Sequence, residues 1–170
     1  MITSPFFNFS VSVVVNAVTT TLTLKLKKGD VIIELLPQLA PNHVKRIEQL
    51  ANEGFYNNCP FHRVIDGFMA QTGDGKNHNG TGGSDYDDLA QEFSNEPHVR
   101  GTVSMARAQS VDSANSQFFI CFGDTPHLNG QYTVFGKVID GMQHIDLLKK
   151  GHPHSGVVDE PDLIVSASVS

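Results

Sequence analysis

Cysteine is scarce in this chain, and its scarcity excludes two common ways of holding a small protein together. The 170 residues include only Cys59 and Cys121. Two cysteines do not make a disulfide framework, and neither belongs to a Cys-x-x-Cys pair of the kind that binds metal. Cys121 lies in a run of apolar residues, so it is best interpreted as a buried thiol that packs like a small hydrophobic group.

Positive charge is also in short supply. Lysine and arginine number 12 against 18 aspartates and glutamates, which leaves a net charge of -6 at pH 7. A protein that binds nucleic acid normally presents a basic face. We therefore expect no nucleic-acid partner. The negative charge is spread out as well, apart from a small cluster at Asp85, Asp87 and Asp88.

Long apolar runs are missing too, and no stretch of about 18 uncharged apolar residues is convincing as a membrane span. Residues 1–23 contain no charged side chain. A signal peptide would begin with a basic region and end with small residues at a cleavage site. This segment lacks the first, and Asn16-Ala17-Val18 matches the second poorly. We expect a cytoplasmic protein without a membrane partner, with the periplasm as the alternative.

What the chain does contain is a series of short alternating segments. Residues 7–16 alternate apolar and polar side chains, which predicts a strand, and residues 20–36 predict a hairpin. A helix is expected to start at Ala40-Pro41-Asn42 and to end at Gly54. Further strands are expected over residues 98–105, 116–122, 132–139 and 163–165. A second short helix is expected over residues 141–150.

This pattern gives about eight strands and two helices, and the helices do not alternate with the strands. It predicts a mainly β protein built on an antiparallel sheet or barrel. The length suits one domain, over residues 21–170, preceded by an extension over residues 1–20. That extension could pack outside the barrel, pair with another chain or be an unprocessed start, and the sequence does not choose.

The stretch over residues 61–74 carries the most unusual set of side chains. Two strand-like runs flank Asp66-Gly67, which is a strong hairpin signal because glycine accepts the positive φ of a tight turn. A cation and an amide, Arg63 and Gln71, lie among the apolar groups Phe61, Phe68 and Met69. This combination suits a ligand that is mostly apolar but has a neutral polar group, such as a peptide bond next to proline.

Other chemistries find little support in the sequence. Gly80-Thr81-Gly82-Gly83 lacks the Gly-Lys-Ser/Thr ending of a phosphate-binding loop, and we interpret it as surface loop. The eight histidines include no His-x-x-x-His pair on a helix, and no Gly-x-Ser-x-Gly nucleophile motif occurs. His62 adjoins Arg63 on a strand, so it should face the core. We expect no metal, no cofactor and no covalent nucleophile.

Several motifs in one order resemble a known family. Residues 61–74 and 113–121, together with Gly80-Thr81-Gly82-Gly83, Val103-Ser104-Met105-Ala106 and Leu128-Asn129-Gly130, are similar to the cyclophilins, which are peptidyl-prolyl cis-trans isomerases. The likeness is strongest to bacterial single-domain members and runs from about residue 21 to residue 165. It implies a closed eight-stranded antiparallel β-barrel capped by two α-helices, and an enzyme that assists protein folding.

The resemblance also implies site residues. Arg63 would be the catalytic arginine, with Gln71 and Phe68 beside it. The remaining residues would bind the substrate: Met69, Ala106, Arg107, Gln117, Phe119, His127, Leu128 and Tyr132. The implied partners are proline-containing peptides and unfolded proteins, bound by a monomer without a cofactor. Two alternatives stay open, namely a module that only binds proline-containing segments and a barrel that carries a small apolar ligand.

Two positions depart from the pattern of the best-known eukaryotic members, and a third departs from many relatives. His127 stands where they carry tryptophan, and Tyr132 stands where they carry histidine. The tryptophan helps to hold inhibitors of the cyclosporin class, so we expect weak cyclosporin binding. Arg107 stands where many relatives have asparagine, which predicts a preference for an acidic residue before the proline.

Overall fold

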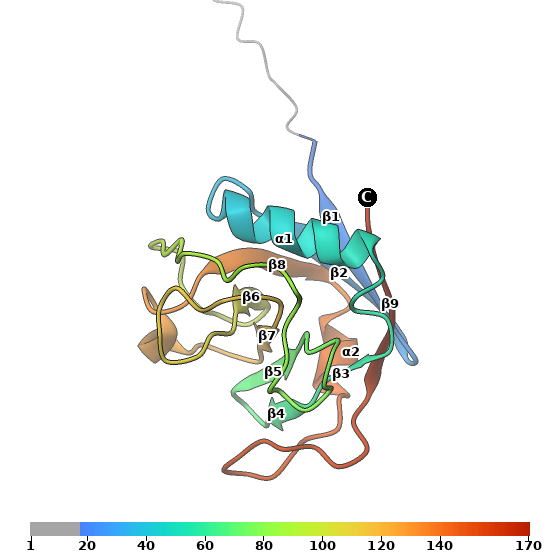
Figure 1. Ribbon diagram of the computed structural model, residues 1–170. Coiled ribbons are helices and arrows are strands. Elements are labelled where there is room, and N and C mark those ends of the chain that lie inside the picture. The colour runs from blue at the N-terminus through green and yellow to red at the C-terminus, as the bar shows by residue number, and fades with distance from the viewer. Residues whose placement is uncertain (1–17) are drawn as a thin grey trace, which may run out of the picture.

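The computed structural model describes residues 18–170, which form one strongly curled sheet with two helices packed on it (Figure 1). The helices are α1 (Pro41–Asn52), α2 (Met142–Asp146) and the 3-10 helix η1 (Pro126–Leu128). The strands are β1 (Thr21–Leu26), β2 (Gly29–Leu35), β3 (Cys59–Pro60), β4 (Arg63–Ile65), β5 (Met69–Thr72), β6 (Thr102–Met105), β7 (Phe118–Cys121), β8 (Val134–Asp140) and β9 (Leu163–Val169).

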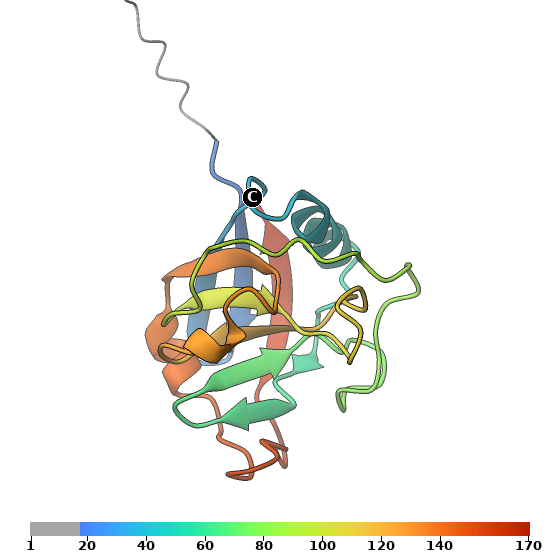
Figure 2. The same cartoon turned by 90° about the vertical axis from the view of Figure 1, so that its left-hand side faces the viewer.

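The sheet is open, so the prediction of a closed eight-stranded barrel is wrong. Its nine antiparallel strands run in the order β3-β9-β1-β2-β8-β6-β7-β5-β4, and β3 and β4 form its two edges. Phe61 and His62 separate these edges along the chain and do not form a turn. The Phe61 N–H donates to the Asp162 carbonyl and the His62 carbonyl accepts from the Val158 N–H, so the chain runs on from β3 to β4 along the segment before β9. Pro60 in β3 has no N–H to donate. The result is a curled half-barrel, with the β4–β5 hairpin at one margin (Figure 2).

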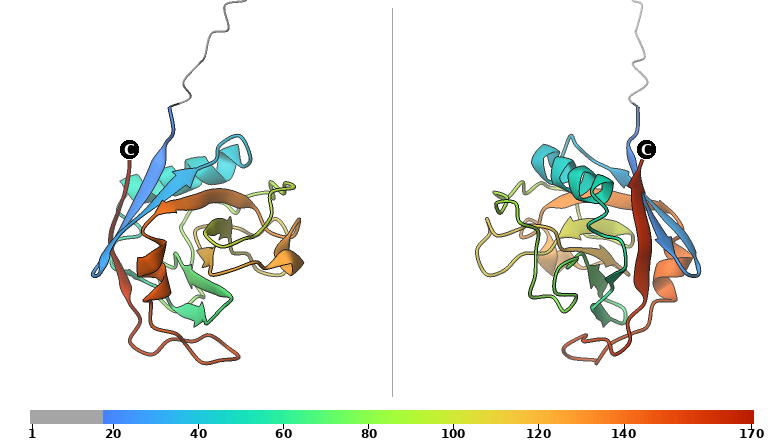
Figure 3. Two further views of the ribbon diagram at one scale, coloured as in Figure 1. Left: turned by 180° about the vertical axis from the view of Figure 1, so that it is seen from behind. Right: turned by 45° about the vertical axis from the view of Figure 1, so that its right-hand side comes forward.

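The core lies inside the curl and follows the alternation of the sequence. In β1 the buried side chains are Leu22, Leu24 and Leu26, and in β2 every second residue is buried as well. Helix α1 buries the stripe that contains Val44, Ile47 and Leu50. Figure 3 shows α2 beside β2 and away from α1, so the helices pack on different parts of the curl.

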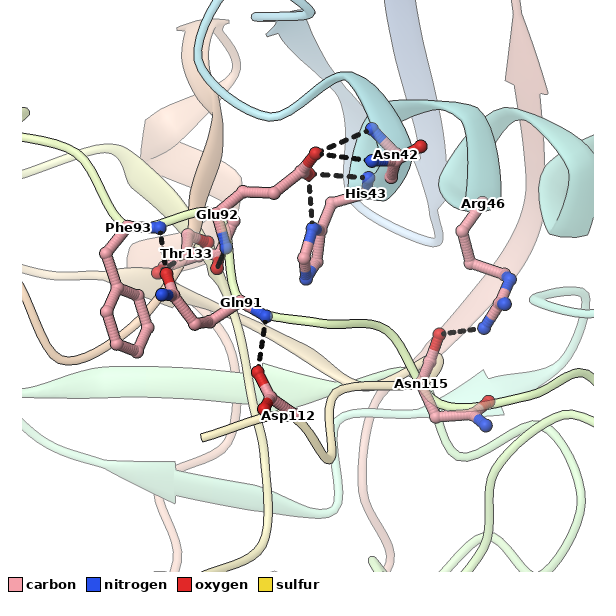
Figure 4. Close-up of polar contacts among 10 residues, drawn as sticks. Asn42, His43, Arg46, Gln91, Glu92, Phe93, Asp112, Asn115 and Thr133 are labelled. Carbon is pink, nitrogen blue, oxygen red and sulfur yellow. Dashed lines mark hydrogen bonds and ion pairs between the residues drawn. The ribbon is translucent and has the colours of Figure 1, made fainter. Parts of the chain in front are cut away.

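A carboxylate from a distant loop caps α1 (Figure 4). Ala40 at the start of the helix has no capping side chain. Instead Glu92 accepts hydrogen bonds from the backbone N–H groups of Asn42 and His43, each at 3.1 Å. The Nδ1 atom of buried His43 lies 2.6 Å from the same carboxylate. A negative group is favourable at a helix N-terminus. Glu92 is itself held in place, because its backbone N–H donates to the Thr133 hydroxyl at 3.0 Å.

Most elements lie where the sequence predicts them. The hairpin over residues 20–36 is confirmed as β1 and β2, and the helix starting near Pro41 is confirmed as α1. The second helix stops at Asp146, earlier than expected. After it, the Lys149 N–H bonds to the Asp162 carboxylate and the Gly151 N–H bonds to the Val64 carbonyl, which draws the chain out of a helical path. The strand predicted over residues 7–16 lies outside the described residues.

Residues 18–170 contain neither a helix suited to crossing a membrane nor a cluster of metal-binding side chains. None of the helices in this range combines the length and the apolar content that a membrane crossing requires. Over the same range, histidine, cysteine, aspartate and glutamate side chains do not gather in groups of three or more that could hold a metal ion.

Candidate active site

The register of four strands places the central side chains of the site in one row. Arg63 in β4 lies opposite Gln71 in β5, Gln71 lies opposite Phe119 in β7, and Phe119 lies opposite Ser104 in β6. Directly opposed residues point to the same face of a sheet. The hairpin that sets this row turns at Asp66-Gly67, where Gly67 has a φ of 72°, as the sequence predicts.

A cavity of about 110 Å³ opens beside this row. An apolar cluster forms its floor and walls: Met69, Phe119, Cys121 and Leu128 are buried, and Phe68, Ala106 and Tyr132 pack against them. The Tyr132 ring meets Phe119 edge to face, with centroids 5.6 Å apart. A cavity of this size and polarity fits a small apolar ring.

Arg63 is held at the mouth of this cavity. Its Nε donates to the carbonyl of Ser155 at 3.1 Å, and its Nη1 donates to Gln71 Oε1 at 3.3 Å. Nη1 also lies 3.9 Å from the sulfur of Met69. Within residues 18–170, Arg63 forms no ion pair with a carboxylate. Its guanidinium is therefore fixed in place while its positive charge stays unneutralised.

The glutamines behind Arg63 form a hydrogen-bonded chain with one direction. Gln117 Nε2 donates to the carbonyls of Gly80 and Gly82 at 2.9 and 2.8 Å. Since carbonyls only accept, this contact turns Gln117 Oε1 toward Gln71, whose Nε2 donates to it at 3.0 Å. Gln71 Oε1 is then left for Arg63, which only donates. The orientations of the Gln71 and Gln117 amides therefore follow from the groups at the two ends of this series of hydrogen bonds, which are the glycine carbonyls and Arg63.

One buried carboxylate organises the loop that supplies those carbonyls. Asp74 is fully buried. It accepts hydrogen bonds from five backbone N–H groups, at 2.8 to 3.2 Å: those of Lys76, Asn77, Asn79, Gly80 and Gly82. Burial alone would raise the pKa of this carboxyl, but the N–H groups outweigh it and lower the pKa to about 2.

The glycines of this loop are required by that packing. A Cβ on Gly82 would lie 2.3 Å from the Asp74 Oδ1 atom, and a Cβ on Gly80 would lie 2.9 Å from the His62 ring. Gly80 also has a φ of 92°, which disfavours other residues. The Gly80–Gly83 stretch thus turns its N–H groups to a carboxylate and its carbonyls to Gln117. It is part of the site, although the sequence indicates only a surface loop.

A second cavity of about 380 Å³ adjoins the first and shares Gln71, Ala106 and Arg107 with it. The Arg107 guanidinium lies 4.7 Å from the centre of the Tyr132 ring. Its Nη2 and Nε donate to the Gln131 carbonyl at 2.9 and 3.1 Å. Arg107 therefore stands on the wall between the two cavities, with its charge held close to both.

The structure brings together nearly all of the residues that the resemblance implied. Nine of them line the smaller cavity: Arg63, Phe68, Met69, Gln71, Ala106, Arg107, Phe119, Leu128 and Tyr132. Gln117 lines the larger one. His127 is not part of either lining, and its ring packs against Phe68 at a centroid distance of 5.4 Å. It supports the wall from outside.

Two supporting residues were not predicted from the sequence. Asp74 is one, and the other is His98, whose buried ring stacks on Phe119 and lines neither cavity. Neither stands in a periodic pattern, because their roles depend on hydrogen bonds formed by loops. The one local signal was Asp74 directly after Gly73 at the end of a strand, in a position where an aspartate often bonds the backbone that follows.

The chemistry open to this arrangement is electrostatic. Burial raises the pKa of the Cys121 thiol, although a hydrogen bond with Thr125 opposes the effect, so it is a poor nucleophile. What the cavity offers a ligand is a fixed cation at its mouth, an amide chain beside it and an apolar interior. Such a site can hold a small ring and stabilise a lone pair close to it.

Comparison with known proteins agrees with this geometry. The family profile "Cyclophilin type peptidyl-prolyl cis-trans isomerase/CLD" matches residues 20–169. A probable peptidyl-prolyl cis-trans isomerase of Brucella suis is 58% identical over 160 residues, covering 88% of this chain and 82% of the relative. A peptidyl-prolyl cis-trans isomerase of Helicobacter pylori is 43% identical over 145 residues, covering 83% and 88%.

Solved structures show the same likeness. A crystal structure of a Cryptosporidium parvum cyclophilin type peptidyl-prolyl cis-trans isomerase superposes with a TM-score of 0.81 at 30% identity, covering 90% of this chain and 98% of that one. A second structure of that protein, determined in the presence of the dipeptide Ala-Pro, has a TM-score of 0.80, with 88% and 98% covered.

Proposed function

Because this chain belongs to the cyclophilin-type peptidyl-prolyl cis-trans isomerases, we propose that it uses Arg63 to accelerate rotation about Xaa-Pro bonds. The chain is an enzyme of that class. The observation that carries the assignment of Arg63 is its fixed, unneutralised guanidinium at the mouth of an apolar cavity. The substrates are proline-containing peptides and unfolded proteins.

The reaction breaks no covalent bond. Amide resonance keeps the Xaa-Pro bond planar and opposes its rotation with a barrier of about 18–20 kcal/mol. Uncatalysed exchange takes on the order of tens to hundreds of seconds. Twisting the bond ends the resonance and leaves a lone pair on the proline nitrogen. An enzyme that stabilises the twisted amide more than either planar form will therefore accelerate the exchange.

Arg63 has the properties that this task requires. It stays protonated, and it offers several N–H donors in a rigid fork. Two of its donors are committed to Ser155 and Gln71, which fixes the direction of the rest. Because the cation is in place before the bond twists, little reorganisation is needed when the lone pair forms.

The apolar wall would keep one side of the Xaa-Pro bond still while the other side rotates. Met69, Phe119 and Leu128 would hold the proline ring while the carbonyl on the other side of the bond turns. Gln71 and Gln117 would hydrogen-bond the substrate backbone. The Ala-Pro dipeptide used with the Cryptosporidium parvum relative supports a proline ligand for this cavity.

An exchange assay on an Xaa-Pro tetrapeptide tests this proposal. We expect wild-type protein to accelerate exchange and Arg63→Ala to lower kcat/KM by about a hundredfold or more, as removal of one group that stabilises charge in the transition state does. Arg100→Ala is the matched control, because Arg100 pairs with Asp146 outside the site. It should stay within about twofold of wild type.

Two outcomes would contradict the proposal. If wild-type protein gives no acceleration, the chain only binds proline-containing segments. If Arg63→Ala exchanges the peptide as fast as wild type, the cation is not the source of the rate.

We further propose weak binding of cyclosporin. His127 packs beside Phe68 and does not line the cavity, so its imidazole offers an inhibitor less apolar surface at this rim than an indole would. Calorimetry should give a dissociation constant far weaker than that of His127→Trp. Equal and tight binding by both proteins would contradict this view.

A further inference from the structure

Phe119 has a second aromatic partner, which lines neither of the two cavities. The imidazole of His98 stacks on it with ring centroids 6.1 Å apart and planes inclined by 16°. His98 is 1% exposed. Phe119 belongs to the wall against which we place the proline ring, so the following inference rests on the proposed function.

Hydrogen bonds at both nitrogens fix the plane of His98. Asn129 Oδ1 accepts the His98 backbone N–H at 2.7 Å, which shows that this atom is the oxygen of the amide. The same oxygen lies 3.1 Å from His98 Nδ1. Since an amide oxygen only accepts, Nδ1 must carry a proton. A neutral His98 is therefore the Nδ1–H tautomer, with a lone pair on Nε2.

The other nitrogen shares a single hydroxyl proton with a backbone carbonyl. Ser104 Oγ lies 2.9 Å from His98 Nε2 and also 2.9 Å from the carbonyl oxygen of Thr133. When His98 is neutral, Ser104 donates to Nε2, and the Thr133 carbonyl keeps its bond from the Met105 N–H at 2.9 Å. When His98 is protonated, Nε2 donates to Ser104, and the hydroxyl turns to Thr133. All the donors are satisfied in either state.

We propose that His98 is a positioning residue for the proline site. Its imidazole, tethered at both nitrogens, fixes the plane of Phe119, and its neutral form is the one that binds the substrate. Protonation reverses the Ser104 hydroxyl and places a charge directly behind the apolar wall. A proline ring on the other face of that wall excludes water, and the loss of water disfavours the charged form.

The surroundings of His98 favour the neutral state. Burial lowers its pKa, the hydrogen bond to Asn129 raises it, and the neighbouring His127 lowers it. The other ionisable side chains nearby do not neutralise a charge on the ring. Arg100, on the same segment, is directed to Asp146, and the thiol of Cys121 is protonated because burial raises its pKa.

Nitrogen-15 NMR of the wild-type protein is the first test. At about pH 7.5 we expect His98 as the Nδ1–H tautomer, whereas free histidine favours Nε2–H. Saturation with an Ala-Pro peptide should lower the pKa of His98 further, because the bound peptide prefers the neutral ring. An Nε2–H tautomer, or a pKa that does not move on binding, would overturn the proposal. This test needs no variant.

The second test uses His98→Phe, which keeps an aromatic ring but cannot titrate. In wild type we expect KM to rise by about threefold or more from pH 7.5 to pH 5.5, with kcat within about twofold. In His98→Phe that rise should vanish, and KM at neutral pH should be raised by about threefold because the ring has lost its tethers. A variant that keeps the wild-type pH dependence would contradict the proposal.

His78→Asn is the matched control. His78 is exposed in a loop and has a φ of 61°, which asparagine tolerates. It should keep the wild-type pH profile. The two proposals fail separately, because a fully active Arg63→Ala would overturn the role of the cation and leave the tautomer and pKa of His98 unaffected.

Discussion

The two walls of the cavity of about 110 Å³, in which we place the proline ring, are built in different ways. The apolar wall, with Met69 and Phe119, sits on β5 and β7, whose ladder fixes each side chain by register. The polar wall, with Gln71 and Gln117, also starts on or next to strands. Its far end, however, depends on two carbonyls of a loop that is wrapped around the carboxylate of Asp74.

The two walls are therefore stabilised by different kinds of interaction. Burial of apolar surface holds the first wall, and the titratable group that we place behind it is His98, which stacks on Phe119. Charge-assisted hydrogen bonds hold the second, and they depend on a single ionised group. The first wall should govern how tightly proline binds, and the second should govern how well Arg63 is aimed. Changes to the two walls should therefore appear in KM and in kcat respectively.

The largest expected effect is on stability, through Asp74. Its pKa is lowered to about 2 in the folded protein from 3.8, so the folded state favours the ionised form by about 2 kcal/mol. This stabilisation is complete above about pH 4 and is lost as the pH falls from about 4 toward 2. Denaturation in urea across this range should show the loss.

Asp74→Asn should remove that stabilisation at neutral pH. An amide N–H would then face backbone N–H groups, so we expect a loss of at least about 2 kcal/mol in the free energy of unfolding. Asp85→Asn is the matched control, because Asp85 is exposed and pairs only with Lys76. If the two variants lose the same stability, the loop is not held by Asp74.

Gln71→Leu should have the next largest effect, this time on kcat. It removes the acceptor for Arg63 Nη1 and the donor for Gln117 Oε1 while keeping a side chain of similar size. We expect kcat to fall by about tenfold with little change in KM, in line with the loss of one hydrogen bond to a charged group. Steady-state exchange kinetics over a range of peptide concentrations separate the two constants.

Leu128→Ala should affect KM instead. Leu128 is 8% exposed and belongs to the apolar cluster around Phe119. If the proline ring binds where we propose, removing the branched end of Leu128 takes away apolar contact with it. We then expect KM to rise by about fivefold while kcat changes by less than about twofold. A fall in kcat as large as that of Gln71→Leu would mean that the two walls do not act separately.

The smallest expected effect is on peptide choice. The Arg107 charge is held on the wall between the two cavities. A peptide with glutamate before the proline should therefore be turned over about threefold faster than one with lysine. This factor corresponds to the free energy of an exposed charge pair. Arg107→Gln should remove the difference. Equal turnover of the two peptides by wild type would contradict this role.

Local sequence signals predicted the parts of the site that depend on strands. Asp66-Gly67 marked the hairpin, and the register of that hairpin sets Arg63 opposite Gln71. The motif resemblance implied Phe119 and Leu128, which lie far from that hairpin in sequence but line the same cavity.

The parts that were missed depend on contacts that have no sequence period. The roles of Asp74 and His98 follow from which backbone groups the loops turn toward them, and those loops have irregular geometry. The open sheet was missed for a similar reason. The backbone groups of Phe61 and His62, between β3 and β4, bond to Asp162 and Val158, and nothing in their own sequence marks those distant partners.

The most direct test of the central claim replaces Arg63 by citrulline through semisynthesis. Citrulline keeps the shape of arginine and most of its N–H donors but carries no charge. If the cation stabilises the lone pair on the proline nitrogen, kcat should fall nearly as far as in Arg63→Ala, by about a hundredfold, while KM stays close to wild type. A citrulline protein with wild-type kcat would contradict the account.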